Sequence, residues 1–331
     1  MWYIENKSRE AAFHFSVEEY IMKHYPFDEP VMMIWQTDRC AMIGNYQIAE
    51  AEIDMRYAKD EGVQIVRRSS GGGTIFTDEG TFLYTIIQPY EDGTQLQQVV
   101  QKTLAAPIVS ALNKMGVPAK AEGRNDILVD GKKVSGLAQY ARHGRICSHG
   151  SLLYDADLEA LVRVLRVDEE KIRSKAISSI RSRVTNVKEH MPQPYSTQEF
   201  LQMLKQKLFE TGEIKEYVLR EHEIEEIEEI CEARYRNPDW TFGRAPKFSF
   251  HNSKRFSGGK VEVYFDVAEG IITDTSIRGD FLGTTPIQGL EELFTGKEFR
   301  DEALSAALES CDLSPYLGGI TKEELLSCIF E

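Results

Sequence analysis

Three consecutive glycines, Gly71 to Gly73, follow two arginines and two serines at the end of an expected strand. A turn without Cβ atoms lets the backbone approach a ligand closely, and its N–H groups can bind phosphate oxygens. Arg67 and Arg68 add planar cations that suit phosphate through paired hydrogen bonds. The segment matches neither the GxxxxGK[ST] nor the GxGxxG nucleotide-binding pattern. A hairpin turn with two surface arginines is the alternative explanation.

A second group of candidate residues lies between Gly123 and Gly136 and contains the adjacent lysines Lys132 and Lys133. Neighbouring side chains of a strand point to opposite faces, so one lysine should point inward, although the pattern does not decide which. Asp126 could hold Mg²⁺ through one carboxylate together with substrate phosphates. A solvated turn is the simpler explanation of the lysine pair taken alone, and a turn explains Asp126 equally well.

Charge is distributed unevenly along the chain. The 331 residues have a formal net charge of −14, yet residues 120–188 contain 14 Lys and Arg against 9 Asp and Glu. The acidic total argues against broad contact with nucleic acid or an anionic membrane. A basic stretch in an acidic protein indicates a small anionic ligand, with a basic solvated face as the alternative.

The N-terminus becomes charged too early for a signal peptide, and no apolar run is long enough to cross a membrane. We therefore expect a cytoplasmic protein. The five cysteines are scattered and form no CxxC pair. This spacing predicts reduced thiols, with neither a disulfide framework nor a zinc site.

The elements that must position these residues mix strands and helices without a strict βαβ rhythm, which predicts an α+β fold. The length predicts two domains, which we place at residues 1–240 and 241–331. In the first domain we expect a helix over 10–24, paired strands over 31–35 and 40–43, a helix over 48–59, strands over 63–66 and 82–87, a helix over 96–115 interrupted or kinked by Pro107, and strands over 126–129, 133–140 and 146–154.

Two later segments of the first domain have distinct compositions. Residues 174–188 are rich in serine and cations without a clear period, which predicts a loop that orders on an anion. Residues 221–232 contain seven glutamates around Ile224, Ile227 and Ile230, which predicts a solvated helix with one buried stripe and no chemistry. In the second domain we expect strands over 248–250, 261–265 and from 271, and helices after Pro286, Asp301 and Thr321.

Four blocks of residues occur in order and at suitable intervals, and together they resemble the lipoate-protein ligase family. The blocks are Arg67-Arg68-Ser69-Ser70-Gly71-Gly72-Gly73-Thr74-Ile75-Phe76, Gly123-Arg124-Asn125-Asp126 with Lys132-Lys133-Val134-Ser135-Gly136, Ser148-His149-Gly150-Ser151-Leu152-Leu153, and Ser179-Ile180-Arg181-Ser182-Arg183-Val184-Thr185-Asn186. The likeness continues into residues 239–248 and the C-terminal region, so it covers nearly the whole chain.

The resemblance implies a large mixed-sheet catalytic domain of the biotin/lipoate-ligase type with a smaller α+β accessory domain. It also implies a two-step reaction, in which lipoate and ATP give lipoyl-AMP and pyrophosphate, and an acceptor lysine then takes the lipoyl group as an amide. The implied acceptors are lipoyl domains of 2-oxoacid dehydrogenase E2 subunits and the glycine-cleavage H protein. The resemblance further implies ATP as cosubstrate with Mg²⁺, and we expect no tightly bound prosthetic group, nucleic-acid partner or membrane partner.

The resemblance also assigns roles to individual residues, with Lys133 as the catalytic residue that contacts lipoate and nucleotide phosphate. The expected ATP-binding residues are Arg68, Gly73, Thr74, Ile75, Phe76 and Lys133, the expected lipoate-binding residues are Lys133, Arg67 and Ser70, and the expected adenylate-loop residues are Arg181, Arg183 and Thr185. A compact cation between two anions lowers the barrier to their reaction, and a covering loop protects a mixed anhydride from water.

The apolar lipoyl chain needs a dry slot, for which Ile75, Phe76 and the Met42-Ile43 strand are candidates, although ordinary core packing explains each of them. The family often has histidine after the aromatic residue of its glycine motif, where this chain has Thr77. Cys147, near His149, leaves open a cysteine-dependent acyltransferase that moves octanoyl or lipoyl groups. A small buried thiol and a hydrogen-bonded structural histidine are the simpler explanations, and a noncatalytic lipoate sensor is a further alternative.

Overall fold

The chain folds into two compact units that interleave in sequence. The structure is a computed structural model that describes residues 1–90, 99, 101–123, 125–165, 182–210, 214–242, 249–268 and 270–330. The first unit contains residues 1–42, 53–66 and 75–237, and the second contains residues 43–52, 67–74 and 238–331. The domain limits expected from the sequence, 1–240 and 241–331, stay a prediction, because packing alone does not establish independent folding.

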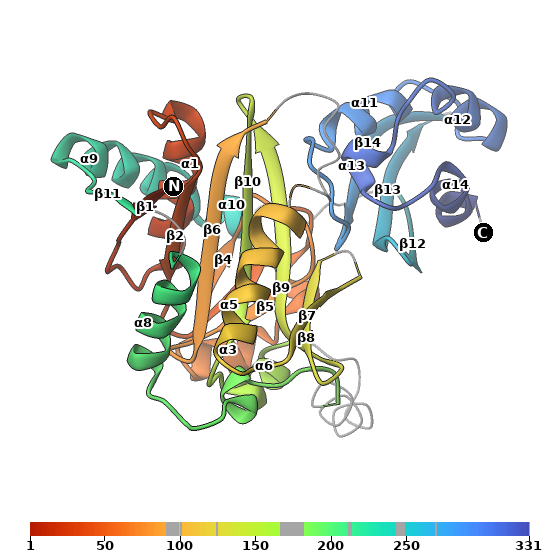
Figure 1. The fold of residues 1–331 in the computed structure, drawn as a ribbon. Coiled ribbons are helices and arrows are strands. Elements are labelled where there is room, and N and C mark those ends of the chain that lie inside the picture. Colours follow the sequence, from red (N-terminus) through yellow and green to blue (C-terminus); the bar gives the residue numbers. More distant parts are fainter. Residues whose placement is uncertain are drawn as a thin grey trace. The chain divides into compact units, whose positions relative to one another are not determined.

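An eight-stranded mixed sheet forms the frame of the first unit, with the strand order β11-β1-β2-β6-β10-β9-β8-β7 (Figure 1). Its strands are β1 (Trp2–Ile4), β2 (Val31–Trp35), β6 (Thr81–Pro89), β7 (Ala119–Glu122), β8 (Asp126–Val129), β9 (Lys132–Arg142), β10 (Arg145–Leu153) and β11 (Lys215–Tyr217). β1 pairs in parallel with β2 and β11, whereas β6, β8, β9 and β10 pair with their neighbours in antiparallel fashion. This arrangement confirms the predicted α+β class with a large mixed sheet.

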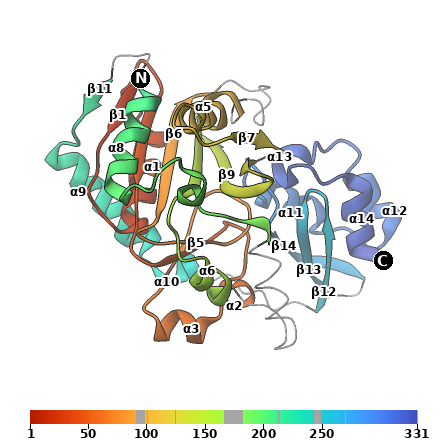
Figure 2. The same ribbon diagram turned by 60° about the horizontal axis from the view of Figure 1, so that its bottom comes forward.

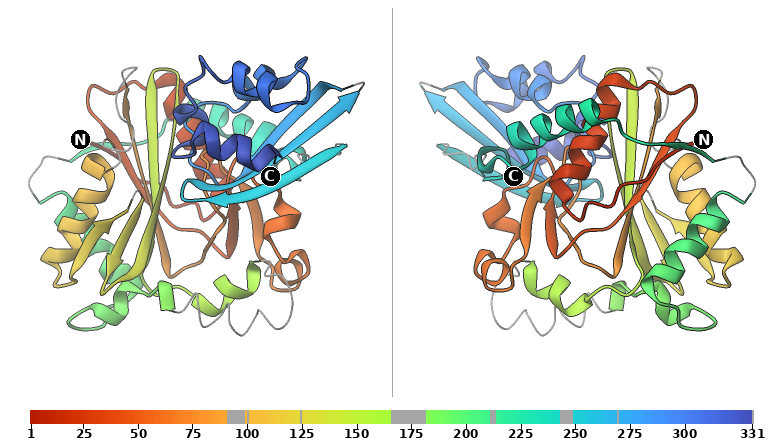
Figure 3. Two further views of the ribbon diagram at one scale, coloured as in Figure 1. Left: turned by 90° about the vertical axis from the view of Figure 1, so that its right-hand side faces the viewer. Right: turned by 90° about the vertical axis from the view of Figure 1, so that its left-hand side faces the viewer.

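Helices cover both faces of the eight-stranded sheet, as Figure 3 shows. The helices of this unit are α1 (Ala11–His24), α3 (Met55–Asp60), η1 (Gln101–Ala105), α5 (Ala106–Lys114), α6 (Leu158–Val164), η2 (Val187–His190), α8 (Thr197–Leu208), α9 (Glu221–Ile230) and η3 (Cys231–Tyr235). Tyr84 of β6 lies in the core that includes residues of α5 and α8. The next residue, Thr85, points to the opposite face, where it donates a hydrogen bond to Glu18 of α1.

Strand β2 and strand β3 (Cys40–Ile43) do not pair with each other, so the predicted hairpin is wrong. β2 pairs with β1 and β6, whereas β3 is the central strand of a second sheet with the order β4-β3-β5. The flanking strands are β4 (Gln64–Arg67) and β5 (Ile75–Thr77). Every residue of β2 and β3 is buried. Two apolar runs of this kind identify strands but not their partners, because they lack the alternation that marks a solvated face.

Two predicted helices have different boundaries in the structure. The helix expected over 48–59 is divided into α2 (Ala49–Glu52) and α3, because Ile53 forms a β-bridge with Leu165 and Asp54 accepts a hydrogen bond as the N-cap of α3. Pro107 lies at the start of α5, directly after η1. Proline is tolerated in the first turn of a helix because its missing N–H has no intrahelical acceptor there.

The second unit is built around a three-stranded antiparallel sheet of β12 (Phe250–Phe256), β13 (Gly259–Ala268) and β14 (Ile271–Gly279), visible side by side in Figure 2. Its helices are α2, α10 (Pro238–Phe242), α11 (Gln288–Phe294), α12 (Asp301–Ala307), α13 (Ser314–Leu317) and α14 (Lys322–Phe330). Phe265, Ile277 and Phe294 lie in its core. Among the described residues of the whole chain, no helix has both the length and the apolar character that a membrane span requires.

Candidate active site

Lys133 lies near the start of β9, directly after a tight turn from β8. Asp130 and Gly131 both have positive φ, 48° and 77°. Two such residues form the turn type whose twist matches the flanking strands of a hairpin. The turn fixes the register of β8 against β9, so that Asp126 lies opposite Gly136 and Leu128 lies opposite Lys133.

The register of this hairpin shifts once, and the shift determines where the Lys133 side chain points. Ile127 pairs with Ser135 and Leu128 pairs with Lys133, so Val134 is an extra residue of β9, a β-bulge. The Lys133 Nζ atom lies 2.7 Å from Asp126 Oδ1, with each side chain about one-third exposed. The structure therefore brings together the lysine and the carboxylate that the sequence singled out as candidates.

The expected adenylate loop is the segment 174–188, and its C-terminal end lies beside the Lys133 backbone. Thr185 donates its N–H to the Lys133 carbonyl oxygen at 3.1 Å, and Val184 forms a parallel β-bridge with Lys133. Thr185 is buried, and its hydroxyl donates to Glu189 Oε2 at 3.1 Å. Arg183 is exposed. Arg181 of the same loop, like Arg124 of the second block, lies outside the described residues.

Arg67 is expected from the family resemblance to contact lipoate, but its side chain donates hydrogen bonds to backbone carbonyl groups of the second unit. Its side chain is 1% exposed. The guanidinium donates to the carbonyl oxygens of Gly44 and Gln47 through Nη1, of Trp240 through Nε at 2.9 Å, and of Thr241 through Nη2 at 2.6 Å. Trp240 Nε1 in turn donates to the Arg67 carbonyl at 2.9 Å. We call the bonds from Arg67 to Trp240 and Thr241 the Arg67 clamp. They join α10 to the start of residues 67–76, which we call the glycine segment.

Arg68 folds back onto the glycine segment that follows it. Its Nε donates to Ser70 Oγ at 3.1 Å, and its Nη2 donates to the carbonyl oxygens of Gly71 and Gly73, each at 2.8 Å. Both Arg68 and Ser70 are buried. The expected phosphate-facing arginine and lipoate-facing serine therefore both point into the loop, whose conformation they stabilise.

The backbone of the glycine segment is only partly open to a ligand. Gly72 donates its N–H to the Phe281 carbonyl at 3.1 Å, and a Cβ at Gly71 would lie 2.5 Å from the same oxygen. Gly73 is exposed, and Thr74 is half-buried with its hydroxyl donating to Gln47 Oε1 at 3.0 Å. The open part of the segment therefore begins at Gly73, which agrees with the family-implied ATP residues and not with the first two glycines.

The candidates for an apolar slot pack as ordinary core. Met42 and Ile43 are fully buried, Phe76 is 1% exposed, and Ile75 is half-buried opposite Met42 in the β3–β5 pair. Thr77, which stands where the family often has histidine, is buried and shares a hydrogen bond with the Thr37 hydroxyl at 2.7 Å. These contacts give the segment structural roles and leave Ile75 as its accessible apolar side chain.

A buried polar cluster lies between α1 and β10, and sequence reasoning, which considered its Cys147 and His149, missed its carboxylate, Glu18. Glu18 is 1% exposed, accepts a hydrogen bond from Thr85 at 2.7 Å and lies 3.1 Å from His149 Nδ1. Cys147 offers its sulfur to the same cluster, which is the one group of three possible metal ligands among the described residues. Glu18 lies four residues after His14 and three before Ile21, so a charge on the apolar stripe of α1 was the available signal.

The environment of Cys147 opposes a nucleophilic role. The thiol is fully buried. Its pKa is raised well above the usual range, first by burial and then by the Glu18 carboxylate. A thiolate is the reactive form of cysteine, so this position suppresses the chemistry that a cysteine-dependent acyltransferase requires.

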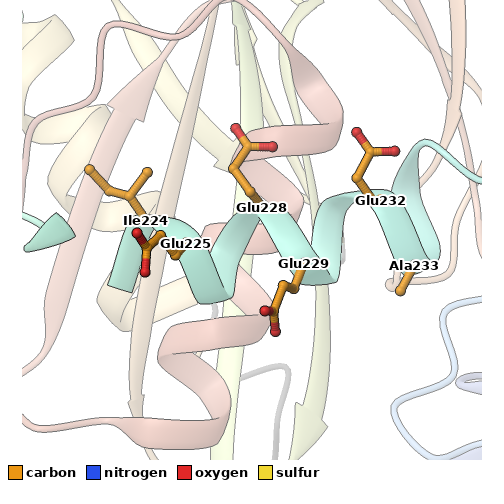
Figure 4. A pocket seen from close by; sticks show the side chains of 6 residues that line it. All are labelled: Ile224, Glu225, Glu228, Glu229, Glu232 and Ala233. Atoms are coloured by element: carbon orange, nitrogen blue, oxygen red, sulfur yellow. The ribbon is translucent and has the colours of Figure 1, made fainter. Parts of the chain in front are cut away.

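The glutamate-rich helix α9 borders a surface hollow with the wrong charge for anionic substrates. The hollow has a volume of about 740 Å³ and is lined by Ile224, Glu225, Glu228, Glu229, Glu232 and Ala233 (Figure 4). The buried side of α9 consists of Glu223 and Ile227, whereas Ile224 is 40% exposed, which corrects the predicted stripe. Four glutamates would repel phosphate or carboxylate, so this hollow does not suit the expected anionic substrates.

Comparison with known proteins agrees with the motifs and the fold. Residues 10–209 match the lipoyl protein ligase A/B catalytic domain, and residues 245–329 match the bacterial lipoate protein ligase C-terminus. The lipoate-protein ligase LplJ of Bacillus subtilis is 37% identical over 334 residues, covering 100% of both chains.

Solved structures resemble the fold as well. P. falciparum LipL1, determined in complex with lipoate, has a TM-score of 0.77 at 23% identity and covers 94% of each chain. A bipartite lipoate protein ligase of Thermoplasma acidophilum, described with its E2 lipoyl domain, has a TM-score of 0.68 at 26% identity and covers 75% of this chain and 98% of that one. With both family regions matched and a full-length relative well above 30% identity, the chain belongs to the lipoate-protein ligase family of enzymes.

Proposed function

We propose that this chain activates lipoate with ATP and transfers the lipoyl group to a lysine of an acceptor lipoyl domain. The observation that carries the proposal is the Lys133 ammonium, held at 2.7 Å from Asp126 at the end of a β-hairpin and one-third exposed. The carboxylate of lipoate attacks the α-phosphorus of ATP, a P–O bond forms, and pyrophosphate leaves. Two anions must approach each other in this step, so a fixed cation between them stabilises the transition state.

The adenylate loop is proposed to cover the product of the first step. Its C-terminal end is bonded to the Lys133 backbone through Thr185, which supports a role near the reacting groups. Arg183 is exposed beside this anchor, and Arg181 belongs to the same proposed loop. A cover over lipoyl-AMP excludes water until the acceptor lysine attacks the carbonyl carbon and AMP leaves.

The glycine segment is proposed to bind ATP through residues 73–76, with Arg68 acting on the shape of the loop. The hydrogen bonds from Arg68 to Gly71 and Gly73 support this division, because they hold the segment and leave the exposed Gly73 available. Arg67 and Ser70 support the loop from inside, so we propose structural roles for them. Their burial argues against the lipoate contacts expected from the family resemblance.

Mg²⁺ is proposed to bind chiefly through the phosphates of ATP. Asp126 fits only as a single carboxylate ligand, because its Oδ1 already faces the Lys133 ammonium and leaves Oδ2 for a cation. One carboxylate together with phosphate oxygens is a usual ligand set for Mg²⁺. When bound, the ion would neutralise charge on the phosphates that Lys133 also approaches.

The acceptors are proposed to be lipoyl domains, such as those of 2-oxoacid dehydrogenase E2 subunits and the glycine-cleavage H protein. The archaeal relative described with its E2 lipoyl domain supports this class of partner. A cytoplasmic location agrees with these partners and remains part of the proposal.

The test is an assay with purified protein, lipoate, Mg-ATP and an acceptor lipoyl domain. We expect AMP and pyrophosphate to appear and the acceptor mass to increase by one lipoyl group. An acceptor in which the target lysine is replaced by arginine is the control and should stay unmodified. AMP formation without acceptor modification would contradict the transfer step, and ligand binding without AMP would indicate a lipoate sensor.

A further inference from the structure

We propose that Gly136 is a positioning residue for Lys133, because only glycine leaves room for the lysine side chain to cross β9 and reach Asp126. The effect on catalysis rests on the proposed function, whereas the positioning itself is a property of the hairpin. The name ammonium seat is used below for Gly136 and Asp126 together.

The space above Gly136 is occupied by the end of the Lys133 side chain. A Cβ added to Gly136 would lie 2.9 Å from Lys133 Nζ and 3.0 Å from Cε. Both separations are shorter than ordinary van der Waals contact, so the lysine must move if residue 136 gains a methyl group. Its long flexible side chain can do so without moving the strand, and the change should therefore displace the ammonium without unfolding the protein.

The β-bulge explains why a glycine three residues away can serve as this support. On a regular strand, residues 133 and 136 would point to opposite faces. The extra residue Val134 cancels one alternation and brings the Lys133 side chain to the side of Gly136. Asp126 lies directly across the ladder from Gly136, so the ammonium that lies over the glycine also meets the carboxylate.

Asp126 completes the seat by orienting the ammonium. Among the described residues, Asp126 Oδ1 is buried and has no aligned hydrogen bond, so its close contact is the ion pair with Lys133 Nζ at 2.7 Å. A flexible lysine without such a partner would sample many rotamers, and ordering it costs entropy. The ion pair places the charge before substrate binds, and the incoming anions can then replace the carboxylate as its neighbours.

The decisive experiment is a double-mutant cycle that combines Gly136→Ala with Lys133→Ala, read out by thermal unfolding. With Lys133 present, Gly136→Ala should lower the midpoint or leave it unchanged. With Lys133 replaced, the added methyl group meets open space and should raise the midpoint, because alanine restricts the unfolded chain. We expect the effects to differ by at least about 2 °C.

Gly150→Ala is the matched control for this cycle. The three atoms nearest to a Cβ there would be Leu137 Cδ2 and Tyr84 Cζ, each at 2.6 Å, and Tyr84 Oη at 2.7 Å, and none of them belongs to Lys133. Its destabilisation should therefore be the same with and without Lys133→Ala. Additive effects of Gly136→Ala and Lys133→Ala would overturn the proposal, whatever the activity of the protein.

The catalytic consequence is measured separately as the rate of lipoyl-AMP formation. Gly136→Ala should lower this rate by about 10- to 100-fold, because a displacement of about 1 Å is costly for a positioned group. A folded Gly136→Ala protein with an unchanged rate would refute the catalytic part. Coupling in the thermal cycle without any adenylation by the wild-type protein would instead refute the proposed function and leave the seat intact.

Asp126→Asn distinguishes the seat from a metal ligand. We expect a lower maximal rate even at saturating Mg²⁺, whatever the change in the Mg²⁺ concentration for half-maximal rate. Glu122→Gln is the control, because Glu122 lies opposite Asp126 on β7 and pairs with Lys120 at 2.8 Å. A raised Mg²⁺ requirement with an unchanged maximal rate would assign Asp126 to the metal and remove it from the seat.

Discussion

Lys132 and Lys133 are adjacent and chemically identical, but as neighbours on β9 they point to opposite faces of the sheet. Lys133 faces Asp126 at 2.7 Å. We expect Lys133→Ala to lower the rate of lipoyl-AMP formation by at least about 100-fold, since removing one preorganised charge partner from a transition state has effects of this size. Lys132→Ala should retain most of the rate. Pyrophosphate release measures both, and equal losses in the two variants would contradict the assignment.

The buried thiol of Cys147 should be inert in the native protein. Its pKa is raised well above the usual range by burial and by Glu18, so the thiolate population at neutral pH is negligible. Cys311, which is only partly buried, provides an internal control. Under iodoacetamide, we expect modification of Cys311 first and of Cys147 only after unfolding, as read by mass spectrometry. Cys147→Ser should keep lipoylation activity with free lipoate, and loss of that activity would revive the acyltransferase alternative.

For individual residues, the sequence indicated which residue types could form a site better than it indicated where their side chains point. The sequence singled out the lysine, the carboxylate and the glycine segment, whose roles stay predictions, but the direction of Lys133 depends on a bulge at Val134 that no composition signal marks. Arg67 and Arg68 have the charge for phosphate, yet backbone carbonyls hold both: those of the distant α10 for Arg67 and those of the following glycine turn for Arg68. Those acceptors exist only after folding, so the sequence alone could not reveal them.

The helix α9 offers a test of how one buried carboxylate contributes to stability. Glu223 is 2% exposed and accepts hydrogen bonds from Tyr217 Oη at 2.7 Å and from Arg220. Burial acts to raise the pKa of Glu223, but the bonds from Arg220 and Tyr217 outweigh it and lower the pKa to about 2. Because the folded pKa is below the usual 4.5, the contribution is complete above pH 4.5 and is lost as the pH falls towards 2.

We therefore expect Glu223→Gln to destabilise the protein at neutral pH and to matter progressively less as the pH falls through this window. Urea unfolding of wild type and variant at several pH values measures the difference. Glu225→Gln, an exposed change on the same helix, should leave stability nearly unchanged at every pH. A Glu223→Gln effect that stayed constant down to low pH would contradict the assigned pKa.

At the scale of elements, the sequence placed most strands and helices but not all of their partners. The hairpin at Asp130–Gly131 was predictable because residues of this kind favour positive φ. The pairing of β3 with β5 was not, since it joins residues more than thirty apart and β3 is buried along its whole length, so no alternation marks its partner. The sequence analysis assigned the buried stripe of α9 to the isoleucines, because a glutamate is not expected to be buried. Glu223 is buried because the folded chain gives it hydrogen-bond partners such as Arg220.

For the molecule as a whole, a net charge of −14 and a basic stretch predict opposite salt effects on two substrates. Increasing NaCl from about 20 to about 200 mM shortens the distance over which charges act. We expect the KM for ATP to rise, because its anionic phosphates lose attraction to the basic stretch. The KM for an acidic acceptor domain should fall, because repulsion between two acidic proteins is screened. Steady-state kinetics at both salt concentrations measure these changes, and parallel shifts would contradict this division of charge.

The Arg67 clamp also limits how the gene for such an enzyme could be divided. A break after Trp240, at the domain limit suggested by the sequence, would fall between the two carbonyl groups that hold the guanidinium. The N-terminal polypeptide would then contain a buried cation with part of its solvation missing, which is costly. A break beyond Phe242 leaves both carbonyls on the polypeptide that carries Arg67. Two separate genes that together replace this one should therefore meet after α10.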